Sequence, residues 1–287
     1  MSRKHSVRTA IIPAGGFGTR FLPATKSIPK EMFPVGGKPV ILHVVEEAVA
    51  AGIEHVIFIT SPQKHAVEDF FSSNQLLEDY LLGRGMMETV GRLKEIQGLA
   101  HYSYVHTQVP YGNGGALLAA EELIDDEPFI VLWGDEIVLT KGPTRAELCI
   151  ETFEAHDLPV ISALRIADPG RHQKYGMAEL KDFEQDGSGN VKQISRITEK
   201  PDPGSSPSEY ATHGAYVLDS DFMNVLKHTY LGKNGELWLS DALNNLISSK
   251  QVLARILPDA LYLDCGNPED YLASQLMYAE HIKEISE

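Results

Sequence analysis

Residues 14–20 read Ala-Gly-Gly-Phe-Gly-Thr-Arg, and residues 29–32 read Pro-Lys-Glu-Met. The first of these stretches follows an apolar run over residues 7–13, which is typical of a buried β-strand. Its three glycines let a ligand approach the backbone closely, and successive free N–H groups in such a loop form a concave anion site. The stretch therefore predicts a phosphate-binding loop at the end of the first strand.

Three cationic side chains, Arg20, Lys26 and Lys30, stand at the end of this loop or shortly after it. The guanidinium group offers a rigid donor fork for phosphate oxygens, and the two lysines add mobile positive charges. The dinucleotide fingerprint G-x-G-x-x-G is excluded because its last glycine would stand at Phe21, and Walker A is excluded because no Gly-Lys-Ser/Thr follows. Glycines alone would also fit a plain tight turn, but the spacing of Arg20 and Lys30 favours a polyphosphate site.

The composition describes an acidic chain of 287 residues with a formal net charge of −15. This charge argues against a general nucleic-acid or membrane-surface binder, so the phosphate-binding charge must be local. Cys149 and Cys265 have neither zinc-site nor disulfide spacing and predict reduced thiols. No apolar stretch is long enough to span a bilayer, and no apolar segment follows the basic residues 3–8, so we expect a cytoplasmic protein.

Strand and helix patterns alternate through the first half of the chain. Apolar and β-branched runs predict strands over residues 7–13, 55–60, 102–108 and 129–133. Helical spacing predicts helices over residues 39–51, 64–82 and 114–124, with a break near Asn74 in the second. This order favours a parallel, doubly wound sheet with ligands at the carboxyl ends of its strands.

The second half is less regular. Strand patterns occur over residues 159–166, 177–183, 191–199, 211–218 and 261–263. Two helices are predicted, one capped by Ser240 and running to about Lys250, and one over residues 268–285. Because neither a repeat nor a clean linker interrupts the chain, we expect residues 1–287 to form a single mixed-sheet domain.

Two aspartates follow predicted strands, Asp135 after residues 129–133 and Asp264 after residues 261–263. Mg²⁺ is typically bound by one or two carboxylates together with substrate phosphates, so both side chains are candidate metal ligands. A turn-capping role for Asp135 stays open on the residues alone. Glu199 and Lys200 lie at the end of another predicted strand, where a plain surface ion pair is the alternative to a ligand site.

The string from Gly18 to Lys26, followed by residues 28–32, resembles the signature of the sugar-nucleotide pyrophosphorylases and is similar to the bacterial UTP–glucose-1-phosphate uridylyltransferases. The resemblance implies a Rossmann-like three-layer α/β/α fold with a mixed, mainly parallel sheet of the nucleotide-diphospho-sugar transferase type. It also implies Mg²⁺-dependent transfer of a uridylyl group from UTP to glucose 1-phosphate, giving UDP-glucose and pyrophosphate. It further implies that about residues 1–140 bind the nucleotide and about residues 141–287 bind the sugar phosphate. It also implies a homo-oligomer, either a dimer or a tetramer.

The resemblance also assigns roles to individual residues. It implies that Arg20, Lys30 and Asp135 are catalytic, and that Asp135 and Asp264 hold the metal. The implied sugar-phosphate ligands are Gly176, Glu199, Lys200 and Gly214. The implied nucleotide ligands are Ala14, Gly15, Gly16, Gly18, Thr19, Arg20, Lys30, Glu31, Gln108, Gly112, Gly115 and Gly134.

The sequence departs from the usual uridylyltransferase pattern at a few positions. Asn113 and Gly115 stand in the base-side loop where the pattern has Leu and His, Glu136 replaces Asp, and Gly36-Gly37 replaces Val-Asp. Another nucleotide, such as dTTP or CTP, or another sugar 1-phosphate therefore stays open as a substrate. A non-catalytic relative that binds sugar nucleotides or regulates a partner subunit also stays open, whereas the missing third glycine disfavours a hydride-transferring dinucleotide enzyme.

Overall fold

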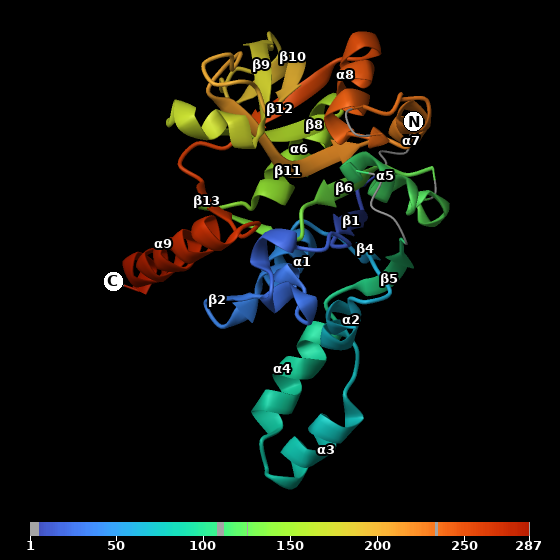
Figure 1. Cartoon of the computed structure of the whole chain (residues 1–287), viewed down its shortest axis with the longest axis vertical. Coiled ribbons are helices and arrows are strands. Elements are labelled where there is room, and N and C mark those ends of the chain that lie inside the picture. Colours follow the sequence, from blue (N-terminus) through green and yellow to red (C-terminus); the bar gives the residue numbers. More distant parts are fainter. Residues whose placement is uncertain (1–5, 108–111, 125, 233–234, 287) are drawn as a thin grey trace.

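The computed structural model describes residues 6–107, 112–124, 126–232 and 235–286. Within them, four strands pair in parallel in the order β5-β4-β1-β6 (Figure 1). These strands are β1 (Thr9–Pro13), β4 (His55–Thr60), β5 (His101–His106) and β6 (Phe129–Leu132), which confirms the strands predicted for this half. Because parallel strands end at the same edge, the loop after β1 and the turn after β6 lie side by side.

The second half of the chain extends this sheet with mixed pairing. Strand β11 runs antiparallel to β6 and β8, β12 runs parallel to β8, and β10 runs antiparallel to β12 and β9. The sheet is thus mixed, because the continuous parallel pairing that we predicted is found only in its first half, and the second half has one parallel pair, β8 with β12. The added strands are β8 (Val160–Arg165), β9 (Gly176–Asp182), β10 (Val191–Glu199), β11 (Tyr210–Leu218) and β12 (Val252–Ile256), the last of which we did not predict.

Apolar side chains leave the central strands on both faces, because successive residues of a strand point in opposite directions. Ala10 and Ile12 of β1 belong to one buried cluster, together with side chains of α1 (Val40–Ala50) and α6 (Arg145–His156). Ile11 belongs to a second cluster, together with side chains of three further helices. Those helices are α5 (Gly112–Leu118), α7 (Asp221–Lys227) and α8 (Leu239–Ser249). Each fully buried aliphatic or aromatic side chain contributes roughly 1.5–3 kcal/mol, so these clusters hold helices against the sheet.

A separate antiparallel pair, β7 (Glu136–Leu139) with β13 (Leu261–Asp264), brings the two predicted metal ligands together. Its register places Asp264 opposite Glu136, and therefore beside the neighbouring Asp135. Helix α9 (Pro268–Ser286) follows β13 and confirms the predicted C-terminal helix. Its Tyr278 packs on the turn between β2 (Pro34–Val35) and β3 (Lys38–Pro39), where Gly36 has a φ of +59° and a side chain would collide with the tyrosine ring.

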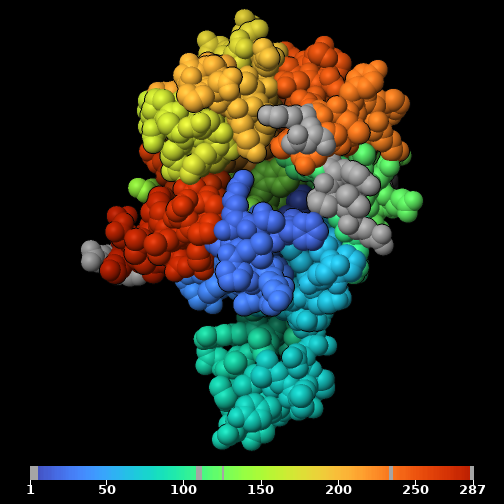
Figure 2. All heavy atoms as spheres, in the orientation of Figure 1, coloured from blue at the N-terminus to red at the C-terminus, as the bar shows by residue number. Residues whose placement is uncertain are grey.

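The helix predicted over residues 64–82 is divided at Asn74, as expected. Helix α2 (His65–Phe71) ends before it, and α3 (Gln75–Gly83) begins after it, with the Leu77 N–H donating to Asn74 Oδ1 at 3.1 Å. Helix α4 (Met87–Gln97), which we did not predict, packs against α3. Together α3 and α4 form an arm that extends away from the rest of the protein (Figures 1 and 2).

Two predicted helix boundaries were wrong. Ser240 does not cap α8, because that helix already begins at Leu239 and Trp238 is its N-cap residue. The Leu239 N–H instead donates to Oδ1 of Asn113, a side chain at the start of α5, at 2.8 Å. The helix predicted over residues 114–124 ends as α5 at Leu118, and a short 3₁₀ helix η4 (Glu121–Leu123) follows. Among the described residues, no helix is both long and apolar enough to cross a membrane.

Candidate active site

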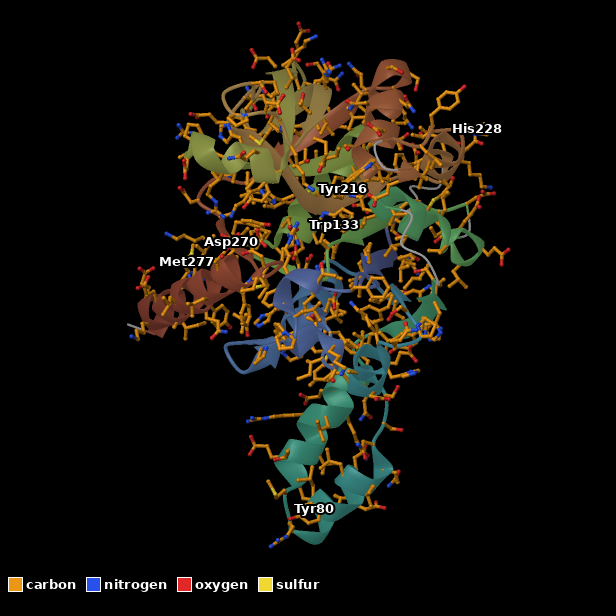
Figure 3. All side chains as sticks on the ribbon, viewed as in Figure 1. Tyr80, Trp133, Tyr216, His228, Asp270 and Met277 are labelled. Carbon is orange, nitrogen blue, oxygen red and sulfur yellow. The ribbon has the colours of Figure 1, made fainter. Side chains whose placement is uncertain are left out.

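A cavity of about 290 Å³ is lined by residues from both halves of the chain. Trp133 and Tyr216 lie in its wall with their ring centroids 5.8 Å apart, in the middle of the molecule as drawn in Figure 3. The sequence-predicted site residues that line this cavity are Arg20, Asp135, Gly176, Glu199, Lys200 and Asp264. The structure therefore brings predicted catalytic, metal and sugar-phosphate residues together around one space.

Lys30 and Asp135 form an ion pair at this cavity, from the 3₁₀ helix η3 (Lys30–Met32) and the turn after β6. Burial acts to lower the pKa of Lys30, but the charges of Asp135 and Glu31 outweigh it and the pKa is raised. Burial acts to raise the pKa of Asp135, but the charge of Lys30 outweighs it and the pKa is lowered. Both groups are therefore charged at neutral pH, and Lys30 is a fixed cation at the edge of the cavity.

Asp135 and Asp264 converge on Gly266. A Cβ atom on that glycine would lie 3.1 Å from Oδ2 of Asp135 and 3.2 Å from Oδ1 of Asp264. Burial and the charge of Asp135 raise the pKa of Asp264, so its carboxylate would gain from a cation placed between the two. The Gly266 N–H donates to Asp264 Oδ1 at 2.9 Å and fixes the orientation of that carboxylate.

These two carboxylates meet the minimum for a magnesium site. The described part of the chain contains no group of three or more His, Cys, Asp or Glu side chains that could hold a metal. Mg²⁺, however, is usually held by one or two carboxylates, with waters and substrate phosphates completing six oxygen ligands. The residues present therefore fit a metal that is bound jointly with a phosphate ligand.

The backbone of the predicted phosphate loop is constrained at Ala14 and at Gly18. The Ala14 N–H donates to Ile59 O at 2.7 Å, which fixes the first residue of the loop against β4. Gly18 has a φ of +63°, and its carbonyl oxygen accepts from the Thr25 hydroxyl at 2.8 Å. Among the other predicted residues of this loop, Gly16, Thr19 and Arg20 are exposed and Gly15 is partly exposed, so they remain accessible to a ligand.

Glu31 lies beneath this loop instead of at its surface. Its side chain is buried, with 1% of the residue exposed, and Oε2 accepts from Lys64 Nζ at 2.9 Å. Gly134, another predicted nucleotide ligand, packs against it, since a Cβ there would lie 3.4 Å from Glu31 Cγ. Sequence analysis did not single out Lys64.

Three of the predicted sugar-phosphate residues, Gly176, Glu199 and Lys200, also line the cavity. Lys200 Nζ lies 3.7 Å from Glu199 Oε1 and 5.3 Å from the centre of the Trp238 ring. Burial raises the pKa of Glu199, and the charge of Lys200 offsets part of that effect. A Cβ on Gly176 would lie 3.2 Å from Glu199 Oε2, so this glycine keeps space beside the carboxylate. A side chain on Gly214 would collide with the Trp133 ring.

The base-side loop is only partly described. Gln108 lies outside the described residues, whereas Gly112 and Gly115 lie in α5. Asn113 caps α8 through Leu239 as well as lining the cavity. Asn113, which differs from the uridylyltransferase pattern, therefore also helps to hold the first residue of α8.

A buried ionic network supports the turn that carries Asp135, and sequence analysis did not find it. The guanidinium group of the fully buried Arg145 donates twice to Glu47, each bond 2.9 Å long, and once to Glu136. Burial acts to raise the pKa of Glu136, but the charges of Arg145 and His213 lower it overall. The Tyr262 hydroxyl donates to Glu136 Oε2 at 3.3 Å, which links β7 to β13 near Asp264.

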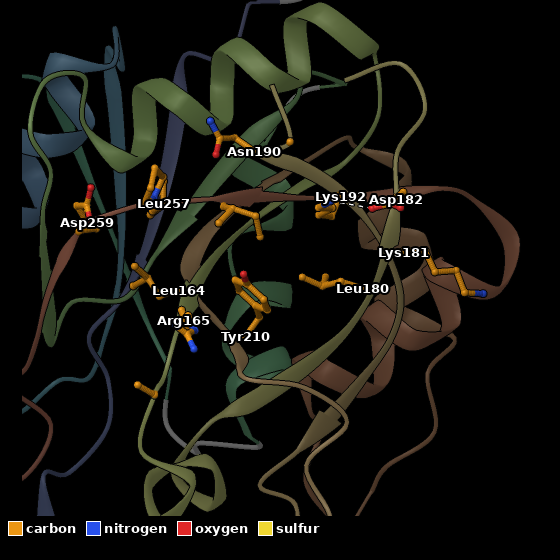
Figure 4. Close-up of a pocket in the computed structure, with 15 residues that line it drawn as sticks. Leu164, Arg165, Leu180, Lys181, Asp182, Asn190, Lys192, Tyr210, Leu257 and Asp259 are labelled. Carbon is orange, nitrogen blue, oxygen red and sulfur yellow. Dashed lines mark hydrogen bonds and ion pairs between the residues drawn. The ribbon is translucent and has the colours of Figure 1, made fainter. Parts of the chain in front are cut away.

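A larger cavity of about 620 Å³ lies elsewhere, beside β8, β9 and β10, and contains none of the predicted site residues (Figure 4). Three of its charged side chains are engaged in ion pairs, since Lys192 binds Asp182 at 2.8 Å and Arg165 binds Glu209 at 2.8 Å. Size alone therefore does not identify the functional site in this protein, and the chemistry points to the smaller cavity.

A glycine loop at the end of a parallel strand, the cations Arg20 and Lys30 after it and two converging carboxylates suit a binding site for phosphate esters in an α/β protein. The chain belongs to the nucleotidyl transferase family, whose sequence model matches residues 9–281. This result confirms the resemblance found in the sequence.

Named relatives agree over nearly the whole chain. The UTP–glucose-1-phosphate uridylyltransferase YngB of Bacillus subtilis (strain 168) is 38% identical over 264 residues, which cover 92% of this chain and 86% of that protein. The UTP-bound UGPase from Acinetobacter baumannii superimposes with a TM-score of 0.86 and 30% identity, covering 98% of this chain and 99% of its own. A UDP-glucose pyrophosphorylase complexed with UDP-glucose superimposes with a TM-score of 0.84 and 30% identity, covering 96% and 99%.

Proposed function

We propose that this chain catalyses the Mg²⁺-dependent transfer of a uridylyl group from UTP to glucose 1-phosphate, giving UDP-glucose and pyrophosphate. One observation carries the proposal. Asp135, Asp264, Glu199 and Lys200 line one cavity, and Lys30 is bound to Asp135. A site of this kind can hold two phosphate compounds with their reacting groups adjacent. The names of the relatives supply the particular substrates.

In the proposed reaction, a phosphate oxygen of glucose 1-phosphate attacks the α-phosphorus of UTP in line and expels pyrophosphate. The attacking phosphate has a second pKa of about 6, so no general base is needed at neutral pH. Catalysis then consists of bringing two anions together and stabilising the charge that develops at phosphorus. The fixed ammonium group of Lys30 is suited to stabilise that charge at the α-phosphate.

The remaining residues position the two substrates. Arg20 and the N–H groups of the glycine loop hold the β- and γ-phosphates, and Lys200 holds the phosphate of the sugar. The carboxylate of Glu199 accepts hydrogen bonds from sugar hydroxyls. Gly176 keeps space beside Glu199, and Gly214 leaves room for the Trp133 ring in the wall of the pocket. The nucleotide ligands proposed in addition are Gly15, Gly16, Gly18, Thr19, Gln108, Gly112, Gly115 and Gly134. Ala14 and Glu31, which the resemblance also implies, are buried and bound to Ile59 and Lys64, so they support the loop from beneath.

Asp135 and Asp264 would hold the magnesium ion. When bound, the ion supplies positive charge that neutralises the phosphates of the reactants. The two aspartates are suited to this because their carboxylates converge on Gly266, and the pKa of Asp264 is raised by burial and by the charge of Asp135.

For the fold, we propose the Rossmann-like three-layer α/β/α arrangement, with helices above and below a mixed sheet. The two buried clusters on opposite faces of β1 support it. We further propose that residues 1–287 form a single domain, with about residues 1–140 binding the nucleotide and about residues 141–287 binding the sugar phosphate. One continuous sheet joins strands from both halves, which supports the single domain.

We propose a cytoplasmic homo-oligomer, a dimer or tetramer, that binds neither nucleic acid nor membranes. The net charge of −15 disfavours both kinds of anionic surface, and the two buried free thiols suit a reducing compartment.

The arm formed by α3 and α4 carries exposed apolar side chains, with Leu76 84%, Met87 64% and Tyr80 58% exposed, and Tyr80 lies far from the cavity in Figure 3. A second copy of the chain could cover them. Light scattering measures the mass, and a monomer would contradict the proposal.

The proposed function is tested by following UDP-glucose formation from UTP and glucose 1-phosphate with Mg²⁺ for the wild type and Asp135→Ala. We expect the variant to lose Mg²⁺-dependent turnover while keeping the circular dichroism of the folded chain. Asp182→Ala, which removes a carboxylate bound to Lys192 at the surface, is the matched control and should keep wild-type turnover. Unchanged turnover of Asp135→Ala would contradict the assigned site.

A further inference from the structure

Lys64 is a buried lysine that the reaction described so far does not use. It is the N-cap residue of α2, and 7% of it is exposed. Its Nζ atom donates to the carbonyl oxygen of Ala14 at 2.6 Å and to Glu31 Oε2 at 2.9 Å. One ammonium group therefore joins three segments, namely the start of the phosphate loop, η3 and the start of α2.

Both backbone polar groups of Ala14 are hydrogen-bonded, and its carbonyl shares a peptide plane with the Gly15 N–H. Its N–H donates to Ile59 at the end of β4, and its carbonyl accepts from Lys64. The glycine loop begins at this residue, so its first peptide has a fixed orientation. A loop that binds phosphates through backbone N–H groups depends on such an orientation, because those groups must point at the ligand.

Glu31 links Lys64 to the catalytic cation. It is 1% exposed, and it is the chain neighbour of Lys30, whose ammonium group binds Asp135. Burial raises the pKa of Glu31, whereas the charges of Lys64 and Lys30 act against that rise. Four charged side chains thus alternate in sign through this region, in the order Lys64, Glu31, Lys30 and Asp135.

We propose that Lys64 is a positioning residue of the transfer reaction, which holds the first peptide of the phosphate loop and neutralises Glu31 so that Lys30 stays at Asp135. This inference rests on the proposed function. Without the Lys64 ammonium group, Glu31 would be a buried carboxylate without its bound cation, which is strongly unfavourable. Lys30, the other cation whose charge acts on Glu31, would be drawn toward it and away from the reacting phosphate.

The test compares steady-state turnover of the wild type with that of Lys64→Met, which keeps the aliphatic stem and removes the charge. We expect kcat to fall about 100-fold, the loss that follows when a catalytic group is misplaced by about 1 Å. KM for glucose 1-phosphate should change little, because the Lys64 ammonium group binds Ala14 and Glu31 and not Glu199 or Lys200. Lys64→Arg, which keeps the charge and can donate two hydrogen bonds, should retain most of the activity.

A second substitution distinguishes positioning from general damage. Adding Glu31→Gln to Lys64→Met removes the unpaired carboxylate, and we expect kcat to recover at least about tenfold, as contacting residues show strong coupling. Lys192→Met, which breaks a surface pair with Asp182, is the matched control and should leave kcat unchanged. If Lys64→Met does not fold, the neutral double variant carries the test, and a kcat as low as that of Lys30→Ala would overturn the proposal.

A Lys64→Met enzyme with wild-type kcat would overturn the assignment, as would a double variant that is no faster than the single one. Turnover of the wild type tests the proposed function separately. If the wild type forms no product, that function is wrong, and calorimetric titration with UTP then decides the role of Lys64. The Lys64→Met variant must bind UTP more weakly because its loop has lost an anchor, and equal affinity would overturn the assignment.

Discussion

Replacing Arg145 with methionine tests whether the buried ionic network supports the active-site turn. Arg145 is fully buried, and its guanidinium group binds both Glu47 and Glu136. Methionine fills much of the same volume but leaves two buried carboxylates without their cation. Glu47 would keep one hydrogen bond, from the Ala146 N–H at 3.1 Å, and Glu136 would keep the one from Tyr262.

The expected loss follows from these contacts. Removing one partner of a buried ion pair costs about 3–5 kcal/mol, and the hydrogen bonds that remain offset part of the second stranded charge, so we expect about 4 kcal/mol. The unfolding entropy is about 2.1 cal/mol/K per residue, or about 0.6 kcal/mol/K for 287 residues. A loss of 4 kcal/mol therefore lowers Tm by about 7 °C.

Thermal unfolding followed by circular dichroism at pH 7 measures this shift. Arg165→Met is the matched control, because Arg165 is exposed and pairs only with the exposed Glu209 among the described residues, so Tm should hardly change. Adding Glu47→Gln and Glu136→Gln to Arg145→Met should regain part of the lost Tm, since no carboxylate is then left unpaired. An Arg145→Met variant as stable as Arg165→Met would refute the reasoning.

Three further predictions concern the site itself. Lys30→Ala should lower kcat at least about 100-fold, because it removes a preorganised cation from the charge that develops in the transition state. Gly266→Ala should raise the Mg²⁺ concentration for half-maximal activity about tenfold or more, because the new methyl group would press on Asp135 and Asp264. The raised pKa of Glu199 means that its carboxylate is protonated at a higher pH than an ordinary glutamate. KM for glucose 1-phosphate should therefore rise as the pH is lowered from about 7 toward 5.

Each of these predictions has an outcome that would contradict it. Near-normal turnover of Lys30→Ala would remove that residue from the mechanism. Gly187→Ala, at a turn with nothing within 4 Å of the new methyl group, should leave the Mg²⁺ requirement unchanged, and an equal effect of both glycine variants would contradict the metal assignment. Glu199→Gln keeps the titration of the substrate phosphate but loses that of the carboxylate, so a pH dependence identical to the wild type would exclude Glu199 as its source.

The sequence predicted the elements that position the site because they carry local signals. The apolar runs of β1, β4 and β6 are fully buried, and such runs are visible without a structure. Asp135 follows β6 and Asp264 ends β13, so the placement of each at the carboxyl end of a strand could be anticipated. Their convergence on Gly266 could not, because it depends on the register of β7 with β13.

Other elements had signals that the sequence analysis did not use. Helix α6 begins with a capping box, in which Thr144 accepts from the Glu147 N–H and Glu147 accepts from the Thr144 N–H. The apolar run of β12 could also have been recognised as a strand. By contrast, Arg145 meets Glu47 across 98 residues of chain, and the two interact only because α1 and α6 pack on the same face of the sheet. Pairs of that kind have no local sequence pattern.

Asn113 shows how a sequence difference can be given too narrow a meaning. We interpreted it as a change at the nucleobase, because it stands in the base-side loop. In the structure, its Oδ1 atom accepts from the Leu239 N–H, 126 residues further along the chain, and so caps α8. The contribution of Asn113 to nucleotide choice must therefore be separated from its contribution to the position of that helix.

The central claim is that the cavity at Lys30, Asp135 and Lys200 transfers a uridylyl group. Pyrophosphate release measured with glucose 1-phosphate and Mg²⁺, in parallel reactions with UTP, dTTP, CTP, ATP and GTP, tests it most directly. We predict rapid release with UTP and little with the other four nucleotides. Faster release with another nucleotide would contradict the assignment of UTP, and release with none of them would contradict the proposed transfer to glucose 1-phosphate.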